Sequence, residues 1–385
     1  MVEKVGKYIK GYIKGKTPKE LFEDNENGLL PYLSPDYLRN ISVPEYYARP
    51  DSKSIVIGSG DVIVLWDGSN AGEVLISKKG ILASTMTMLK FDENEIDKTY
   101  FAYSFKNLEY VLKAKTAGSG IPHADKGVIS KLDFYKPSLR EQTAIANILS
   151  KVDEAIESVK KSIAAAERLK KSLMQNLLTG KMKADGTFRT EEEFYDDPKF
   201  GKVPVGWEVK KVKKCFKFKN GKGNTTSNLK QIPDKDFCIS VFGGNGITGY
   251  FHTALLNEPT IIVGRVGEYC GNVFKTPERS WVTDNAMLVS EVLMQDFDID
   301  FFTMKLNSLN FKQYSDSTGQ PKITQGSIGN VVFAYPKMVE EQNNIISSID
   351  NISNSIKYKQ SKITTLERLK KSLMQNLLTG KVRVK

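Results

Sequence analysis

Very few residues in this sequence have the types and spacing that chemistry would need. Gly244, Gly246 and Gly249 match the dinucleotide-binding pattern Gly-x-Gly-x-x-Gly and follow an apolar strand pattern. The residues after Gly249 do not open a helix, however, and no surrounding βαβ unit is indicated. We therefore assign this segment to a loop between strands. A nucleotide-dependent enzyme stays a minor alternative, which a rise in melting temperature with NAD or ATP would support.

The residues that could bind a metal or act as nucleophiles are equally scattered. His123 and His252 are the two histidines, and they stand at non-corresponding positions in the chain. Together with three unevenly spaced cysteines they form no zinc-binding pattern. The sequence also lacks a Walker loop and the Asn-Pro-Pro-Tyr motif of adenine methyltransferases. It predicts no catalytic residue, no metal and no cofactor, so catalysis is expected to belong to partner proteins.

Polar side chains suited to reading DNA are gathered instead in loop segments rich in Gly, Asn and Pro. Arg and Lys suit guanine, Asn and Gln suit adenine, and hydroxyl groups adapt to several bases. For each residue alone a solvated loop position is the stronger alternative, and for each lysine a phosphate contact is favoured over a base contact. As a set they predict a polar, basic rim. The candidates are Lys14, Lys16, Thr17, Ser69, Asn70, Ser119 and His123 in the first half, and Lys222, Asn224, Thr225, Asn245, Arg265, Gln320, Lys322 and Gln325 in the second.

The charge balance favours a polyanionic partner. The chain has 56 Lys and Arg against 45 Asp and Glu, a net charge of +11. Clustered cations gain free energy when they neutralise phosphates and release counterions. A surplus of this size does not by itself separate nucleic acid from other partners.

A segment that occurs twice organises the whole chain. Residues 167–181 recur letter for letter as residues 367–381, an offset of 200. Upstream of each copy, apolar residues are spaced by three and four, as in a heptad seam. The first seam is Ile145, Leu149, Val152, Ile156, Val159, Ile163 and Ala166. The second is Ile345, Ile349, Ile352, Ile356, Lys359, Ile363 and Leu366, in which only Lys359 breaks the apolar stripe.

Each seam predicts a long amphipathic helix. Ser138 and Glu141 fit a capping box at the first start, which the second copy lacks, and Gly180 and Gly380 stand where a left-handed C-cap belongs. About 42 residues would make a rod roughly 60 Å long. One such helix alone cannot bury its stripe, so we expect the two to pair as an intramolecular coiled coil.

Positions of the repeat outside the seam are preserved as faithfully as the seam itself. A coiled coil tolerates drift at such positions, so their identity favours one face offered to two copies of the same partner. Recent duplication is the alternative explanation. The candidate partner contacts are Lys170, Lys171, Gln175 and Asn176 in the first copy, and Lys370, Lys371, Gln375 and Asn376 in the second.

The regions before the two helices differ in sequence but share their turns. Each opens with a Lys/Gly turn, continues with a short apolar strand and a glycine loop, and ends with a Gly-x-Pro turn. Short alternating strands between such turns predict mixed, mainly β domains. We divide the chain into a first domain (1–137), a first helical region (138–181), an acidic linker (182–206), a second domain (207–338) and a second helical region (339–385).

Over nearly its whole length the chain resembles the specificity subunits of type I restriction–modification systems. The resemblance rests on Pro204-Val205-Gly206-Trp207, the glycine loop at 243–250, the paired Gly-x-Pro turns and the repeated helix end Leu-Leu-Thr-Gly-Lys. The first half departs from the pattern, because it has no Pro-x-Gly-Trp motif at its start.

The resemblance implies an α+β fold in which two mainly β target-recognition domains are separated by two long helices. These helices would form an antiparallel coiled coil with pseudo-two-fold symmetry. Each domain would read one half of a split site in double-stranded DNA. The helices would set the spacing and bind two methyltransferase subunits, to which restriction subunits add, and the chain itself would be non-catalytic.

A coiled-coil scaffold whose domains bind proteins or glycans is the alternative from another class. Salt separates the two hypotheses, because DNA affinity falls steeply with salt and an apolar protein interface does not. No segment is long and apolar enough to cross a bilayer, and the first residues read as a strand, not as an export signal. We therefore expect a cytoplasmic protein with reduced thiols and no membrane partner.

Overall fold

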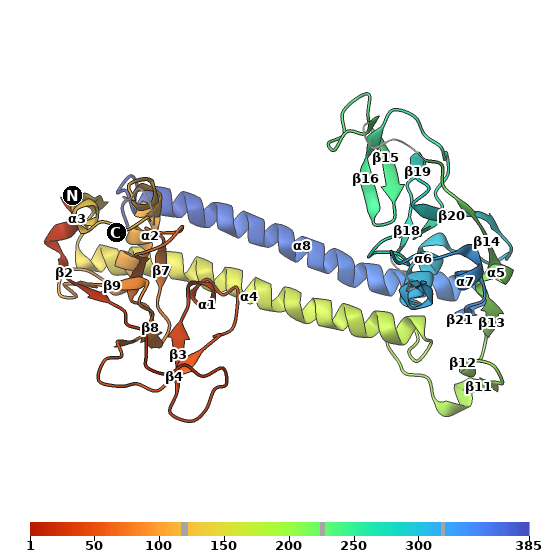
Figure 1. The fold of residues 1–385 in the computed structure, drawn as a ribbon, viewed down its shortest axis with the longest axis horizontal. Coiled ribbons are helices and arrows are strands. Elements are labelled where there is room, and N and C mark those ends of the chain that lie inside the picture. Colours follow the sequence, from red (N-terminus) through yellow and green to blue (C-terminus); the bar gives the residue numbers. More distant parts are fainter. Residues whose placement is uncertain (117–121, 224–227, 317–319, 385) are drawn as a thin grey trace. The chain divides into compact units, whose positions relative to one another are not determined.

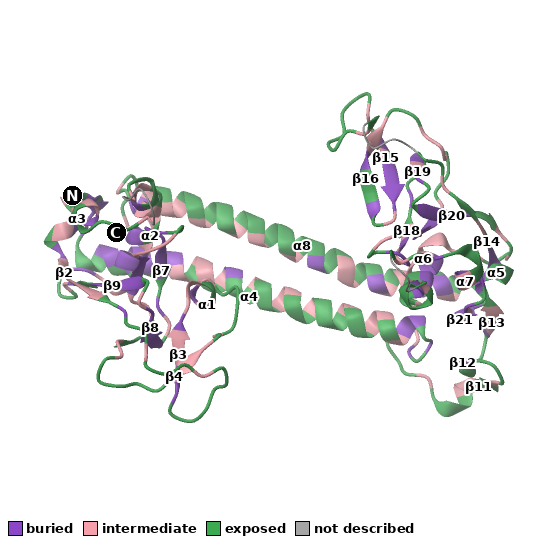
Figure 2. Cartoon of the chain, in the orientation of Figure 1, coloured by how far each residue is buried: buried purple, intermediate pink, exposed green. Residues whose placement is uncertain are grey.

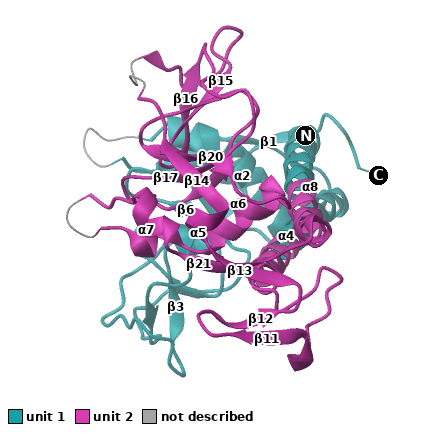
Figure 3. Ribbon diagram, turned by 90° about the vertical axis from the view of Figure 1, so that its right-hand side faces the viewer, with its two compact units in different colours: residues 1–161, 360–385 teal, residues 162–359 magenta. Residues whose placement is uncertain are grey.

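The structure is a computed structural model of the 385-residue chain, and it describes residues 1–116, 122–223, 228–316 and 320–384. The chain forms two compact units (Figure 3). Unit 1 comprises residues 1–161 and 360–385, and unit 2 comprises residues 162–359. The two long helices, α4 (Leu139–Leu178) and α8 (Val339–Leu377), each contribute to both units.

Unit 1 contains a mainly β domain (Figure 1). Its strands are β1 (Val2–Lys4), β2 (Ile9–Lys14), β3 (Leu30–Leu33), β4 (Tyr47–Ala48), β5 (Val56–Ile57), β6 (Val62–Leu65), β7 (Val74–Ile76), β8 (Gly80–Leu82), β9 (Met86–Phe91) and β10 (Asp133–Tyr135). Its short helices are η1 (Val5–Lys7), α1 (Pro35–Leu38), α2 (Lys98–Ala114) and α3 (Lys126–Lys131).

Unit 2 contains a second mainly β domain. Its strands are β11 (Phe194–Asp197), β12 (Gly201–Pro204), β13 (Trp207–Lys211), β14 (Phe216–Asn220), β15 (Ile239–Gly243), β16 (Gly246–Phe251), β17 (Ile261–Gly264), β18 (Val273–Lys275), β19 (Ser280–Val282), β20 (Ala286–Val292) and β21 (Val332–Pro336). Its short helices are η2 (Glu191–Glu193), α5 (Val212–Cys215), α6 (Ile299–Ser308), η4 (Phe311–Tyr314) and α7 (Gln325–Gly329).

The two domains follow one strand plan. Unit 1 has a four-stranded sheet in the order β2-β9-β6-β7, and unit 2 has β14-β20-β17-β18. A second sheet contains a parallel pair in each unit, β3 with β8 and β15 with β19. The first strand of each domain pairs with the last, β1 with β10 and β13 with β21. This repeated topology confirms the predicted α+β fold with two mixed domains.

The long helices bury their apolar stripes as the heptad spacing predicts. In unit 1, Ile145 and Leu149 of α4 share a core with Leu377 of α8, whereas in unit 2 Leu177 of α4 shares a core with Ile345 of α8. The start of one helix therefore meets the end of the other, and the pair is antiparallel within each unit. Figure 2 shows the outer helix faces largely exposed. In the described part of the chain, no helix is both long and apolar enough to cross a membrane.

A buried glutamine fixes the start of each long helix to its own domain. Gln142 accepts a hydrogen bond from the backbone N–H of Asp97 at 2.9 Å, and its amide donates to the carbonyls of Glu95 and Pro137 at 3.1 and 3.0 Å. Gln342 makes the same three kinds of contact with residues 298, 296 and 336. Because both glutamines are fully buried, losing these bonds would leave unpaired polar groups.

The neighbouring glutamate accounts for a difference from the expected capping box. The backbone N–H of Glu141 donates to Ser138 Oγ at 3.4 Å, but the Glu141 carboxylate accepts two hydrogen bonds from Arg383, at 2.8 and 2.7 Å. The capping box of α4 is therefore only half formed. In unit 2, Glu341 accepts instead from Arg189 at 2.5 Å and from the indole of Trp207 at 2.9 Å.

Each long helix is followed within three residues by a glycine with left-handed backbone, as the sequence predicts. The φ angles of Gly180 and Gly380 are +72° and +74°. A Cβ at Gly180 would lie 2.4 Å from Pro204, and one at Gly380 would lie 2.7 Å from the Tyr135 ring. Both glycines therefore combine a conformation that favours glycine with a close approach to their domain.

A buried lysine caps the C-terminal end of α4. Lys305 is 4% exposed; its amine donates to the carbonyl of Leu178 at 2.5 Å and lies 5.5 Å from the centre of the Trp207 ring. The carbonyl is an orphan acceptor at the helix end, where a cation is favoured. Burial nevertheless lowers the pKa of Lys305 to about 8, because the charged form is desolvated.

We expect the unfolding free energy of Lys305→Met to depend less on pH than that of the wild type. The variant should therefore compare more favourably with the wild type at pH 7 than at pH 10.5. The pKa of Lys305 lies near 8 in the folded chain and near 10.5 when unfolded, so the unfolded chain binds more protons between these values. The wild type should therefore gain about 3 kcal/mol in unfolding free energy across this window, and the variant should not. Chemical denaturation of both proteins at both pH values measures the difference. An identical pH dependence would contradict a titrating buried amine.

Candidate nucleic-acid interface

Three segments carry the candidate DNA-contacting residues of unit 2, and the fold brings them together. Lys222 follows β14, Arg265 follows β17, and Lys322 precedes α7. The backbone N–H of Lys222 donates to the carbonyl of residue 282 at 2.8 Å, and that of Arg265 donates to residue 285 at 2.8 Å. Arg265 also accepts from the N–H of Ile323 at 2.8 Å. These side chains, far apart in sequence, therefore share one edge of the domain.

The turn of the glycine fingerprint joins the same edge. Gly243 and Gly246 pair across a hairpin between β15 and β16, which confirms a loop between strands at this point. A Cβ on Gly264, at the end of β17, would lie 2.1 Å from the carbonyl of Gly244. The exposed Asn245 at the hairpin tip is consequently held near the segment that carries Arg265.

Unit 1 assembles the equivalent three segments around a carboxylate. Lys14 ends β2, Asp67 follows β6, and His123 precedes α3. One carboxylate oxygen of Asp67 lies 2.7 Å from His123 Nδ1, and the other accepts from Lys14 Nζ at 3.1 Å. The N–H of Gly68 donates to the carbonyl of Pro122 at 3.1 Å, as Gly267 does to Pro321 at 2.9 Å in unit 2.

The electrostatics of this cluster keep Asp67 ionised. Burial opposes its ionisation, but the hydrogen bonds from His123 and Lys14 outweigh burial and hold the pKa of Asp67 below its ordinary value. Asp67 corresponds to Val266 in unit 2, and His123 to Lys322, because both pairs form the same isolated bridge. The carboxylate–imidazole pair thus belongs to unit 1, and the corresponding positions of unit 2 hold a valine and a lysine.

The remaining candidates are placed at or beside these edges. Lys16, Ser69 and Asn70 are exposed in unit 1, and Thr17 is exposed with its hydroxyl donating to Ser84 Oγ at 3.1 Å. Gln320 and Gln325 are exposed in unit 2. Ser119, Asn224 and Thr225 lie outside the described residues.

Aromatic residues that the sequence did not single out stand behind both rims. Trp66 meets Tyr12 edge-on at 6.0 Å between ring centres, and Lys126 lies 5.2 Å from the Tyr12 ring. In unit 2 the indole N–H of Trp281 donates to the carbonyl of Lys222 at 2.9 Å. Apolar strand runs containing these residues read only as core, so no sequence signal placed them beside the polar loops.

The helix faces are less exposed than the sequence suggests. Lys171, Gln175, Lys371 and Gln375 are exposed, but Lys170, Asn176 and their counterparts Lys370 and Asn376 are half-buried. These four side chains are therefore less open to solvent than positions outside the seam lead one to expect; the Lys370 amine, for example, pairs with Asp153 of α4 and lies beside the Tyr103 ring of α2.

The described residues contain no group of three or more His, Cys, Asp and Glu side chains placed to hold a metal ion. Cys215 and Cys270 are buried, and burial raises the pKa of Cys215 to about 11, so its thiol stays protonated near neutral pH. Both rims carry hydrogen-bond donors and cations on fixed loops, and such groups are the ones that contact phosphates and base edges in protein–DNA complexes.

A glycine with no room for a side chain sets the position of each lysine loop. A Cβ on Gly221 would lie 2.1 Å from the carbonyl of Thr283, and one on Gly15 would lie 2.1 Å from that of Ala83. The loops that carry Lys222 and Lys16 therefore depend on close approach of two backbones.

We expect Gly221→Ala to lower the free energy of unfolding by about 1–3 kcal/mol, because the new methyl group forces these backbones apart. Gly223→Ala is the matched control, since its Cβ would meet nothing closer than 3.8 Å. Thermal unfolding of the two variants makes the comparison. Equal stability of both variants would show that the approach is not required.

Comparison with known proteins finds a matching family model and several similar proteins. The family model of the type I restriction modification DNA specificity domain matches residues 5–168 and again residues 204–368. The type I restriction enzyme MjaVIII specificity subunit of Methanocaldococcus jannaschii is 32% identical over 405 aligned residues, which cover 100% of this chain and 93% of that protein. The EcoprrI specificity subunit of Escherichia coli is 25% identical, over 97% of this chain and 91% of that one.

Solved structures share the fold at lower identity. A type I restriction–modification S subunit from M. genitalium superimposes with a TM-score of 0.60 at 18% identity, covering 98% of this chain and 96% of that one. The HsdS subunit from Thermoanaerobacter tengcongensis gives a TM-score of 0.51 at 15% identity, covering 99% and 97%. At such identities the likeness concerns the fold alone.

Proposed function

Because the chain belongs to the family of type I restriction–modification DNA specificity proteins, we propose that each of its two target-recognition domains reads one half of a bipartite site in double-stranded DNA. The observation that carries the proposal is the repeated loop edge. Both domains hold the same three segments together with the same backbone hydrogen bonds, yet the side chains on them differ. One scaffold with two different sets of polar groups suits two different half-sites.

The differing positions are those from which base edges would be read. Trp66, Asp67 and His123 of unit 1 correspond to Arg265, Val266 and Lys322 of unit 2. Arg and Lys suit the O6 and N7 acceptors of guanine, whereas a carboxylate suits the amino group of cytosine. The two rims therefore favour different bases in the major groove.

Shared positions fit phosphate contacts. Lys16 and Lys222 are both exposed and both follow the constricted glycine, and their N–H groups donate to equivalent strand carbonyls at 3.2 and 2.8 Å. A cation repeated in both domains carries no information about sequence but fixes the position of the backbone of DNA. We assign these two lysines to phosphates.

The long helices then serve as a spacer and as the docking surface for two methyltransferase subunits, through which restriction subunits join the complex. The antiparallel pairing within each unit and the duplicated outer face support this role. The chain itself performs no methyl transfer or cleavage, and it acts in the cytoplasm, where its DNA target lies.

Exchange of one domain tests the proposal. The chain with residues 1–137 replaced by the corresponding domain of a relative, assembled with its methyltransferase subunits, should methylate a site in which one half is new and the other is unchanged. Sequencing that detects methylated bases maps the sites in both complexes. A folded hybrid that alters both halves together would show that the domains do not read independently.

Two single substitutions separate phosphate from base contacts. Lys222→Ala should weaken binding to all sequences alike and reduce the slope of log affinity against log salt by about 1. Arg265→Ala should cost about 1–3 kcal/mol on the specific site and relax the preference at one position. Lys199→Ala, an exposed lysine of the β11–β12 turn, is the control. Anisotropy titrations at several salt concentrations measure all three. Salt-independent binding by the wild type would instead support a protein or glycan scaffold.

A further inference from the structure

The duplicated helix segment meets different surroundings in the two units. In unit 1, Lys370 forms an ion pair with Asp153 at 2.6 Å. The hydroxyl of Tyr103 donates to the other oxygen of the same carboxylate at 2.7 Å, and the Lys370 amine lies 5.4 Å from the Tyr103 ring. The lysine side chain is 28% exposed. Lys370 is therefore already neutralised and held within the chain.

The matching lysine of unit 2 has different neighbours. By the 200-residue offset Lys170 corresponds to Lys370, and the residue that corresponds to Asp153 is Ser353. The Ser353 hydroxyl donates to the carbonyl of Ile349 at 2.9 Å. Within the described part of the chain, Lys170 has no carboxylate at ion-pairing distance. Identical residues of the repeat thus present different charge.

The difference extends along the partner helix. Residues 150–159, which belong to unit 1, carry three acidic and one basic side chain, whereas residues 350–359, in unit 2, carry one acidic and two basic. Glu154 and Glu157 are exposed, and so are their counterparts Asn354 and Lys357. Within this ten-residue stretch, the duplicated basic segment therefore meets a net negative partner in unit 1 and a net positive one in unit 2.

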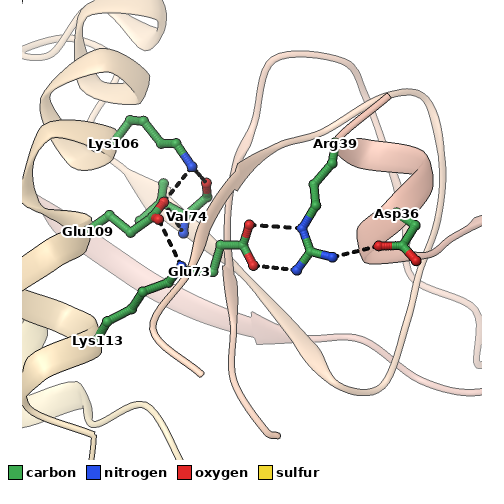
Figure 4. Close-up of polar contacts among 7 residues, drawn as sticks. All are labelled: Asp36, Arg39, Glu73, Val74, Lys106, Glu109 and Lys113. Atoms are coloured by element: carbon green, nitrogen blue, oxygen red, sulfur yellow. Dashed lines mark hydrogen bonds and ion pairs between the residues drawn. The ribbon is translucent and has the colours of Figure 1, made fainter. Parts of the chain in front are cut away.

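Other cations near Lys370 are also paired. Lys370 and Asp153 line a cavity of about 560 Å³ in unit 1, together with Arg39, Glu73 and Lys106. Arg39 is held by Glu73 at 2.5 Å and by Asp36 at 2.6 Å (Figure 4). Lys106 pairs with Glu109, whose carboxylate also binds Lys113. The cations that line this cavity thus have their positive charges matched by carboxylates of the same unit.

We propose that the two copies of the repeated helix face bind two copies of one methyltransferase subunit unequally, and that the copy in unit 2 binds first, through acidic side chains opposite Lys170 and Lys171. This inference rests on the proposed docking function and adds an order to it. An incoming carboxylate gains the attraction of an unpaired lysine at unit 2. At unit 1 it must compete with Asp153 and meets the like charges of Glu154 and Glu157.

Reciprocal substitutions exchange the two environments. Asp153→Ser removes the carboxylate that holds Lys370, and Ser353→Asp supplies one beside Lys170. With a purified methyltransferase subunit that assembles with this chain, Ser353→Asp should weaken the first binding step roughly two- to fivefold, and Asp153→Ser should strengthen the second by a similar factor. Both effects should shrink at high salt. The double exchange should reverse the order of filling.

Fluorescent labels identify which site fills first. Ala165 in unit 2 and Thr365 in unit 1 are exposed, matched positions two residues before the repeat, and each is replaced singly by Cys in a Cys238→Ser chain. Titration of each labelled chain with the methyltransferase subunit gives the affinity at that site, and native mass spectrometry counts the subunits bound. Glu258→Ser, an exposed carboxylate outside the helices, is the control for net charge.

Each outcome decides the matter. Equal affinities at the two labels, unchanged by the exchange, overturn the unequal binding and leave the specificity function intact. No binding at either label at 50 mM salt overturns the proposed docking as well. Asp153 also accepts from Tyr103, so Asp153→Ser could disturb unit 1; Glu157→Lys with Lys357→Glu then makes the same charge exchange on exposed side chains and must give the same reversal.

Discussion

Each long helix carries an apolar stripe that water disfavours, and the rest of the architecture depends on covering it. The stripe on α4 cannot be covered by its own domain alone, because the helix continues for 40 residues. The opposite end of α8 supplies the missing surface in unit 1, and the roles are exchanged in unit 2. Pairing two copies of one helix covers both stripes. It also creates two similar helix-pair ends, one in each unit, and each of them holds one domain.

The attachment of a domain to its helix-pair end uses a short, repeated set of contacts. Gln142 and Gln342 each bridge three backbone groups of the domain at which their helix starts. The end of α4 lies against the domain of unit 2 at Gly180, and the end of α8 lies against the domain of unit 1 at Gly380. In the described part of the chain, the hydrogen bonds and close approaches of these residues go to other segments than the loops that carry the candidate DNA contacts. Side chains on the loops can therefore change while the contacts that attach the domain to the helices stay the same. Two domains that read different half-sites need this independence of recognition from attachment.

The sequence predicted what depends on periodicity and on backbone conformation. The seams from Ile145 and Ile345, the left-handed glycines and the two mainly β domains all follow from local rules that tertiary packing reinforces. It did not predict what depends on side chains meeting across long sequence distances. Arg383 meets Glu141 across 242 residues and Lys305 meets Leu178 across 127, and no local pattern marks either residue. The same limit applies to Asp67, whose charge matters only because Lys14 and His123 happen to converge on it.

Unit 1 is assembled from both termini of the chain, and this has a consequence during translation. Its core contains Leu377 and Leu378, and its buried Glu141 accepts a hydrogen bond from Arg383. The first domain is therefore synthesised before the residues that complete its core. At ribosomal speeds the missing segment follows roughly 10–40 s later. Throughout that interval the part of α4 that belongs to unit 1 lacks its cover from the end of α8, whereas unit 2 is continuous in sequence and can close as soon as its last residue emerges. A prematurely terminated chain therefore exposes an apolar helix face, and exposed apolar surface is what chaperones and proteases recognise.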